Sequence, residues 1–272
     1  MAYIREEEII SLIVHIFKEN LRNSLERLSS IYTKLLREDE ERIGPVLTNI
    51  SRQYIDDDYS GKVDENITHK DIPRLSKYFP LCMRHLQDQL QIDSHLRHGG
   101  RMQYGLFLKG IGMSLQESLL FWKIAFSKKF TEDQFNKKYA YNIRYNYGQE
   151  GKRTDYRPYS CAKIIMTNPP STGDHHGCPF RHASLDTLSK MLKHSGVREN
   201  RISEICSYAK EGHYQLACTR MLEILTGADN GERLTENITH PNKYFEQCYP
   251  GSEYNQKNKL PDTNNHDDFM DI

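Results

Sequence analysis

The chain has 272 residues, of which 27% are charged, and its 37 Lys and Arg balance 37 Asp and Glu, so overall charge identifies no class of partner. This length is enough for one or two domains with a hydrophobic core, and no apolar stretch is long enough to predict a membrane span. The N-terminus has no short apolar run before a small-residue cleavage site, so we expect no secretory signal.

Positive charge is concentrated in the middle of the chain. Between Arg97 and Lys163, 13 Lys and Arg stand against 5 Asp and Glu, whereas the final "PDTNNHDDFMDI" has no Lys or Arg. A basic middle region indicates either a face that binds an anionic polymer through counterion release or a merely solvated basic surface.

The first part of the chain has the spacing of an amphipathic helix. Apolar residues recur at helical intervals between residues 5 and 36, which predicts one long helix or two. The acidic, turn-rich segment at 54–66 then predicts a linker. We therefore divide the chain into a helical piece (1–53), a linker (54–69), a main domain (70–246) and a polar, disordered tail (247–272).

The main domain shows short and frequent helical signals. Ser114 with Glu117 and Thr131 with Gln134 are capping-box patterns, each of which predicts a helix start. Gly196 predicts the end of another helix, and two more are expected at 202–210 and 214–225. The expected fold class is mainly α.

Two long segments between these helices, 147–160 and 167–182, are rich in Gly, Pro, Asp and Ser. Loops of this length are usually functional or held by something other than a core. Just before the first loop, four tyrosines occupy odd positions, so an extended chain would place them on one face: Tyr139, Tyr141, Tyr145 and Tyr147. This pattern predicts either a core-facing strand or small β-hairpin, or an aromatic surface for nucleic-acid bases.

The stretch "LRHGGRMQYGLFLKGIG" (96–112) combines arginines and glycines with large apolar residues. Glycines allow close approach of a ligand to the backbone, and arginine forks suit phosphate. No Walker-type lysine motif follows, so this is not a nucleotide-hydrolysis loop. The alternative is a solvated turn that leads into a buried helix.

Six cysteines are present, and none forms a CxxC pair. A single cysteine is more often a small buried apolar residue than a ligand. Cys178 differs, because it lies in the loop motif "HHGCPF", and a Cys-Pro step is typical of the last ligand in ferredoxin sequences. Spacing alone leaves open which cysteines would join it, and whether zinc or an iron–sulfur cluster would be bound.

Several long motifs resemble the large, regulatory subunit of eukaryotic and archaeal DNA primase, mainly its C-terminal domain. They are "FPLCMRHL", "LRHGGRMQYGLFLKGIG", "YNIRYNYGQEGKRTDY", "YSCAKIIMTNPPSTGDHHGCPFRH" and "HYQLACTRM". The resemblance covers about residues 70–245. Residues 1–60 resemble the helical end of that subunit's N-terminal domain. Most of that domain is absent, so we expect a fragment or an incomplete gene model.

The resemblance implies a helical domain that holds a 4Fe–4S cluster. The ligands carried over by motif are Cys82, Cys161, Cys178 and Cys218. Cys206 and Cys248 lie outside the ligand motifs. A cluster held by distant segments would replace part of the core that this polar region lacks.

The resemblance also implies binding of the template–primer junction and the RNA primer's 5′-triphosphate. The implied contacts are Arg97, His98, Gly99, Gly100, Arg101, Met102, Lys109, Tyr139, Tyr141 and Asn142. For Met102 the expected group is the backbone N–H. The sequence leaves open whether Tyr104, Tyr145 and Tyr147 touch nucleic acid, and packing is the alternative for Tyr104.

The implied function is that of a non-catalytic nuclear subunit that supports RNA primer initiation, length control and handover. Its implied partners are the catalytic primase subunit and DNA polymerase alpha. A nucleotidyltransferase or nuclease would need clustered carboxylates, but Asp155 and Asp174 lie in separate loops without a DxD pair. A zinc-bound structural DNA-binding module is the other alternative, and visible colour would distinguish a cluster from zinc.

Overall fold

The structure is a computed structural model with two compact units, Met1–Gln53 and Tyr54–Ile272. It describes residues 10, 12–29, 31, 59, 67–167, 169–227 and 237–250. Within the first unit residues 12–29 are helical, as the spacing predicts, and apolar side chains such as Ile13 and Phe17 are exposed. The domain boundaries given above stay predictions, and residues 251–272 of the expected tail lie outside the described residues.

The described part of the second unit is built from helices, which confirms the mainly α fold class. In chain order they are α2 (Ile72–Leu75), a 3-10 turn η1 (Ser76–Tyr78), α3 (Leu81–Asp93), α4 (His98–Gly110), α5 (Leu115–Phe126), α6 (Glu132–Phe135), a π-helical turn η2 (Asn136–Ala140), α7 (Tyr141–Asn146), α8 (Cys161–Met166), α9 (Pro179–His182), α10 (Leu185–His194), α11 (Glu199–Lys210), α12 (Tyr214–Thr226) and α13 (Pro241–Cys248). β pairing in the described residues is limited to isolated bridges, Ile67 with Met113 and Tyr147 with Asp155.

The predicted helix starts are confirmed by their caps. The Ser114 side chain accepts a hydrogen bond from the Glu117 N–H at the start of α5. At α6, Thr131 and Gln134 form the full reciprocal capping box. Because each cap satisfies N–H groups that have no partner inside the helix, these short sequence signals fix where the helices begin.

The expected extended conformation around the tyrosines is wrong, because residues 136–146 are helical. In a helix the odd-position pattern does not define one face. Tyr139 is buried against Phe126, with ring centroids 4.9 Å apart, while Tyr141 is 50% exposed. Ala140 and Ile143 are buried with Tyr139, so the apolar side of a helix, not of a strand, faces the core.

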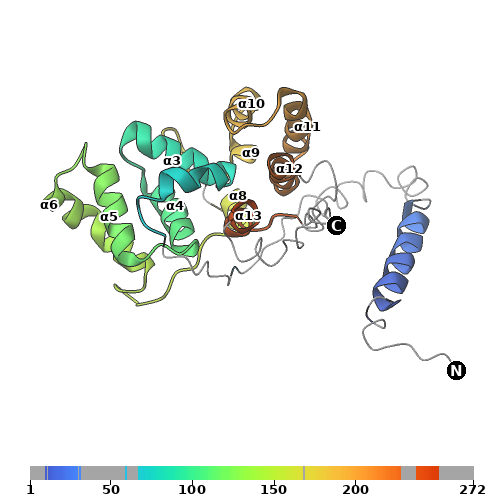
Figure 1. The fold of residues 1–272 in the computed structure, drawn as a ribbon, viewed down its shortest axis with the longest axis horizontal. Coiled ribbons are helices and arrows are strands. Elements are labelled where there is room, and N and C mark those ends of the chain that lie inside the picture. Colours follow the sequence, from blue (N-terminus) through green and yellow to red (C-terminus); the bar gives the residue numbers. More distant parts are fainter. Residues whose placement is uncertain are drawn as a thin grey trace, which may run out of the picture. The chain divides into compact units, whose positions relative to one another are not determined.

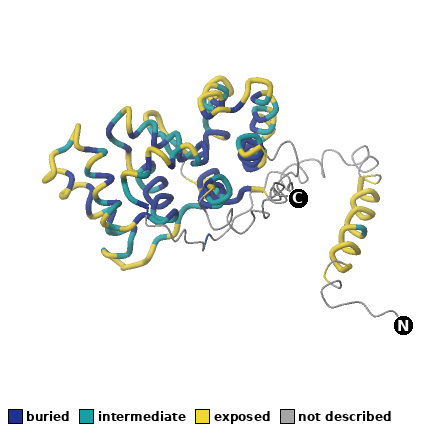
Figure 2. The backbone as a smooth tube through the Cα atoms, in the orientation of Figure 1, coloured by how far each residue is buried: buried dark blue, intermediate teal, exposed yellow. Residues whose placement is uncertain are grey.

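The helices form two groups with a seam between them. Figure 1 shows α3, α4, α5 and α6 on one side and α9 to α12 on the other, with α8 and α13 in between. Helix α13 contacts both α4 and α12. Figure 2 shows buried backbone where the groups face each other. No helix in the described ranges is both long and apolar enough to cross a membrane.

Candidate functional site

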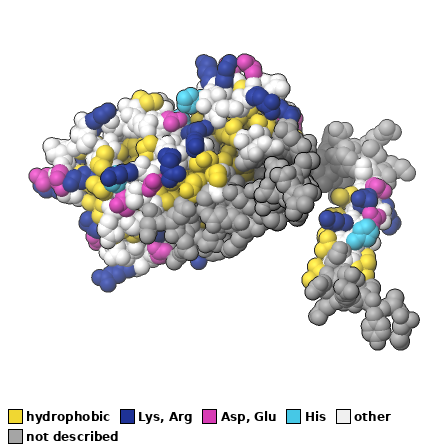
Figure 3. Space-filling view, in the orientation of Figure 1, with side chains coloured by type: hydrophobic (Ala, Val, Ile, Leu, Met, Phe, Trp, Pro, Cys, Tyr) yellow, Lys and Arg dark blue, Asp and Glu magenta, His cyan; other side chains and the backbone are white. Residues whose placement is uncertain are grey.

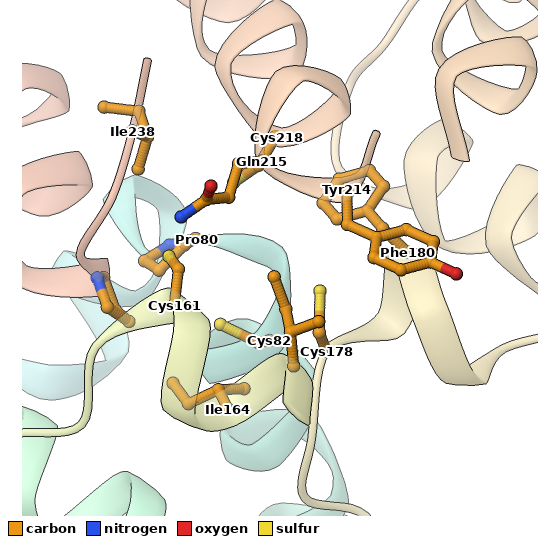
Figure 4. Close-up of a pocket in the computed structure, with 12 residues that line it drawn as sticks. Pro80, Cys82, Cys161, Ile164, Cys178, Phe180, Tyr214, Gln215, Cys218 and Ile238 are labelled. Atoms are coloured by element: carbon orange, nitrogen blue, oxygen red, sulfur yellow. The ribbon is translucent and has the colours of Figure 1, made fainter. Parts of the chain in front are cut away.

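The four cysteines of the family motifs come from four separate elements. Cys82 lies in the first turn of α3, Cys161 begins α8, Cys178 precedes α9 and Cys218 lies within α12. All four line one pocket at the seam between the helix groups, with a cavity volume of about 20 Å³. Figure 4 shows them around this common space. We call it the cysteine pocket.

Local sequence explains why three of these thiols lie at helix starts. Pro80 caps α3 in an extended conformation, and Pro179 occupies the first turn of α9, where a missing N–H costs nothing. Ser160 caps α8, and its side chain accepts the Lys163 N–H at 3.2 Å. Helix N-termini favour negative charge, so the caps place Cys82, Cys161 and Cys178 where thiolates are best tolerated.

Burial opposes ionisation of Cys82, Cys178 and Cys218. It raises the pKa of Cys178 to about 11, and it raises the pKa of Cys82 and of Cys218 well above the usual range of a thiol. Repulsion between the groups adds to this, because Cys178 raises the pKa of Cys82, and both raise that of Cys218. These thiols therefore lie in one another's field, and only a positively charged partner would allow them to be thiolates together.

The rest of the pocket wall is mostly apolar and includes Ile164, Phe180 and Ile238. Cys206 and Cys248 lie on α11 and at the end of α13 and do not line it. Among the described residues, no three His, Cys, Asp or Glu side chains form a group that could hold a metal ion. The four cysteines line the pocket with soft sulfur donors, the donor type that iron–sulfur clusters take.

The opening of the glycine-rich stretch forms the N-terminus of α4. Arg97 is the capping residue, and its Nη1 donates to the Thr172 carbonyl at 2.9 Å. Its side chain remains 59% exposed. The N–H groups of the first helical turn have no partner inside a helix, so this end of α4 offers donors for an anion.

Gly99 and Gly100 let the start of α4 pack closely against two other segments, the 167–182 loop and α3. A Cβ on Gly99 would lie 2.7 Å from the His176 ring, and one on Gly100 would lie 3.2 Å from the Leu86 side chain. Glycine is needed here for close packing of the 167–182 loop and of α3. Whether a ligand also approaches these glycines stays a prediction.

Arg101 is held in a half-buried position. Its Nη1 donates to the Leu96 carbonyl at 2.8 Å, and its guanidinium lies 5.0 Å from the centre of the Tyr139 ring. The Nε atom is buried with no hydrogen-bond partner. Burial lowers the pKa of Arg101, and burial and then Arg101 lower the pKa of His98. An unpaired buried guanidinium nitrogen leaves a donor unsatisfied, which an anion could correct.

Helix α7 brings Asn142 to Met102, with Nδ2 3.6 Å from the Met102 Sδ. Met102 is the fifth residue of α4, where helix geometry directs its N–H to the His98 carbonyl. Contact of that N–H with an anion stays a prediction. The hydroxyl of buried Tyr139 lies 3.2 Å from His95, so its contact with a base likewise stays a prediction.

Lys109 lies far from this helix end and is engaged by its own chain. Its ammonium donates to the Asn146 carbonyl at 2.9 Å, the Tyr156 carbonyl at 2.8 Å and the Asp155 carboxylate at 2.5 Å. All three donors of the ammonium are used. Its expected phosphate contact stays a prediction, and one that requires an acceptor to be released.

Tyr104, which the sequence left open, packs in the core. Its ring is fully buried, and its hydroxyl donates to Gln87 Oε1 at 2.7 Å.

A hollow beside the α4 N-terminus contains two residues that the sequence did not single out. It has a cavity volume of about 100 Å³, and its lining includes His98, Gly99 and Met102 together with Lys163 and His176. Lys163 lies two residues after Cys161, and His176 lies two residues before Cys178. Their position next to the ligand motifs was the one sequence signal that could have identified them. Lys and Arg side chains also spread across the middle of the face in Figure 3 and over α10 and α11.

Comparison with known proteins identifies the family. Residues 74–245 match the family model for the C-terminal domain of the large subunit of eukaryotic and archaeal DNA primase. The chain is 45% identical over 251 residues to the probable DNA primase large subunit of Arabidopsis thaliana, covering 90% of this chain and 54% of that protein. It is 44% identical over 248 residues to the DNA primase large subunit of Homo sapiens, covering 90% and 48%. The chain spans about half the length of these curated relatives. With four motif cysteines around one pocket and a family match over most of its described helices, the chain belongs to the DNA primase large-subunit family.

Proposed function

We propose that this chain serves as a regulatory, non-catalytic part of a DNA primase and binds the template–primer junction through a domain built on a 4Fe–4S cluster. The observation that carries the proposal is the cysteine pocket, where Cys82, Cys161, Cys178 and Cys218 meet from four elements. The family match supports the role in primer synthesis.

The donor set fits an iron–sulfur cluster. Cys82, Cys161, Cys178 and Cys218 would hold it, and the apolar wall would exclude water. When bound, a cluster supplies positive iron charge that stabilises thiolates and can exchange an electron. A lone zinc ion would instead need all four sulfurs about 2.3 Å from one point.

The test is metal and sulfide analysis of anaerobically purified protein. We expect about four irons and four sulfides per chain and a brown colour, because a [4Fe–4S] cluster takes four cysteines. Cys178→Ser should lose both, and Cys206→Ser is the matched control that should keep them. Colourless protein with one zinc per chain would instead support the zinc-bound structural module.

For nucleic acid, the proposal places the primer's 5′-triphosphate at the α4 N-terminus and template or primer bases near α7. Arg97, His98 and Arg101 would contact phosphates, with Gly99, Gly100 and Met102 around them. Asn142 would lie near the triphosphate, and Tyr139 and Tyr141 beside bases. A triphosphate is a dense anion that several guanidiniums and N–H donors satisfy better than one lysine.

The catalytic carboxylates belong to a partner in this proposal. The catalytic primase subunit would make the primer and DNA polymerase alpha would receive it, in the nucleus. The purified chain alone should therefore make no dinucleotide on a template, and synthesis without a partner would contradict a non-catalytic role.

A further inference from the structure

A short segment before α13 joins two of the helices that carry the pocket cysteines. The Ile238 N–H donates to the Thr219 hydroxyl oxygen at 2.8 Å, directly after the pocket cysteine of α12. The Thr239 carbonyl accepts the Cys161 N–H at 2.9 Å, at the start of α8. We call residues 237–240 the clasp. Its hydrogen bonds tie α12 to α8 beside two of the four thiols.

The clasp is buried and forms part of the pocket wall. Ile238 is 2% exposed, and Thr239 and His240 are buried with it. Ile238 and Pro241 both line the cysteine pocket. At the end of the clasp, the His240 Nδ1 accepts the Asn242 N–H at 3.1 Å, which caps the start of α13. An opened clasp would therefore remove one side of the pocket and separate buried polar groups from their partners.

The clasp is bonded to α12 through the hydroxyl of Thr219. This hydroxyl donates to the Gln215 carbonyl at 2.9 Å within the helix, which leaves its oxygen lone pairs to accept the Ile238 N–H. Thr219 is 3% exposed, and a buried N–H that loses its acceptor carries the full cost of desolvation. A valine at this position would have the same shape and offer no acceptor, so one substitution can remove the bond and keep the packing.

From this arrangement we propose that Thr219 is a positioning residue that holds the clasp closed, and that opening of the clasp sets how fast the cysteine pocket loses iron. The closed clasp fixes the Cys161 N–H through the Thr239 carbonyl and closes the pocket with Ile238. A local opening of this kind costs less free energy than global unfolding, so it determines how often a buried site meets solvent. The inference rests on the proposed function for the cluster, whereas the clasp itself is made by the chain's own hydrogen bonds.

Hydrogen exchange of the full chain, read by mass spectrometry on peptides, tests the clasp itself. In Thr219→Val, exchange should rise about 5- to 10-fold at Ile238 and also at Cys161, because loss of one buried hydrogen bond shifts the open population by about that factor. Thr226→Val is the matched control: the Thr226 hydroxyl also donates to the carbonyl four residues earlier in α12, at 2.8 Å, whereas the clasp bonds to Thr219. Thr219→Ser keeps the acceptor and should exchange as the unaltered chain does.

Iron retention tests the link between the clasp and the pocket. In anaerobically purified protein, Thr219→Val should lose its visible absorbance to a chelator about 5- to 10-fold faster than the unaltered chain. Thr226→Val and Thr219→Ser should lose it at the unaltered rate. Rescue by serine separates the hydrogen bond from the packing of the side chain, which a purely structural role would not do.

Unchanged exchange at Cys161 in Thr219→Val would overturn the clasp, and so would equally fast iron loss in Thr226→Val or Thr219→Ser. If Thr219→Val does not fold, the unaltered chain decides, because exchange at the clasp and at Cys161 should then rise together on chelation and separate behaviour would overturn the inference. If iron is bound but its loss is indifferent to Thr219, the proposed function stands without this inference. A purified chain without iron would contradict the proposed function and the iron-retention part of the inference, and the exchange measurements would still decide whether the clasp exists.

Discussion

The Arg101 side chain is held in place by its neighbours and still has one hydrogen-bond donor without a partner. The Leu96 carbonyl and the Tyr139 ring hold its guanidinium, while the buried Nε has no partner. Holding a guanidinium in place before an anion arrives reduces the entropy lost on binding. Under the proposed function, Arg101 would therefore favour a ligand that carries the anion over one that lacks it.

We expect Arg101→Ala to weaken binding of a triphosphorylated RNA–DNA duplex with a 3′ template overhang by about 1.5–3 kcal/mol, the range for a hydrogen bond to a charged group. The effect should largely disappear on the same duplex with a 5′-hydroxyl, because the partner anion is missing. Anisotropy titrations of both duplexes at one salt concentration measure this difference. Equal losses on the two ligands would reduce Arg101 to a general backbone contact.

A second single residue, Tyr104, is expected to stabilise the core rather than to bind nucleic acid. Tyr104→Phe leaves buried Gln87 Oε1 without its 2.7 Å donor, which should cost about 1–3 kcal/mol of stability. Thermal unfolding should show a midpoint several degrees lower, with nucleic-acid affinity unchanged. Tyr208→Phe, at a half-buried ring on α11 outside the proposed nucleic-acid contacts, is the matched control for loss of a hydroxyl. A stable Tyr104→Phe protein with weaker binding would contradict the packing role.

Among the elements, α8 carries a cysteine on a six-residue helix that depends on its cap. The Ser160 side chain accepts the Lys163 N–H, and Cys161 is the next residue. A helix this short has little stability of its own, so its cap and its packing determine where the Cys161 sulfur lies.

Ser160→Ala should therefore lower stability by about 1 kcal/mol and speed the loss of iron to a chelator. Ser184→Ala is the matched control, since Ser184 caps α10 in the same way with a 3.2 Å bond from the Thr187 N–H and α10 has no cysteine. Absorbance loss under chelator and thermal unfolding separate the two effects. Equal rates of iron loss in the two variants would show that the α8 cap does not position Cys161.

Elements with local signals could be predicted from sequence, and those set by distant contacts could not. The cap of α6 depends on Thr131 and Gln134 alone, so the sequence locates it. The tyrosine pattern misled because it contains spacings of two, which fit a strand, and of four, which fit a helix. Burial of Ala140 and Ile143 favours the helix. Lys109 looked free because Asn146 and Asp155, which bind it, lie far along the chain. For the cysteines, resemblance to the family motifs predicted which four line the pocket, whereas their spacing along the chain did not.

At the scale of the whole second unit, the cysteine pocket lies where two helix groups meet. Cys82 belongs to α3 in one group, and Cys178 and Cys218 belong to α9 and α12 in the other. Under the proposed function, the bound cluster is a crosslink between groups that also meet through α13 and through the hydrogen bond from Arg84 to the Ser195 carbonyl. Metal binding free energy then becomes folding free energy.

Iron removal should thus loosen the seam more than the interior of either group. Hydrogen exchange after chelation should rise in α8, α9 and α12, while α5, which carries buried Trp122, stays protected. The thermal midpoint should fall, and Cys248→Ser should respond to chelation as the unaltered chain does. Uniform loss of protection, or none, would show that the pocket is not a crosslink.

The placement of Cys218 in α12 also sets an order of events during synthesis. A ribosome releases Cys82, Cys161 and Cys178 well before α12, so the nascent chain has at most three of the four thiols available. Until α12 arrives, the apolar wall around Ile164 and Phe180 lacks one of its sides. Exposed apolar surface of this kind is prone to aggregation. Under the proposed function, a cluster with four cysteine ligands would therefore be completed only after α12 has been synthesised, and the interval before that is when the nascent chain would most need a chaperone.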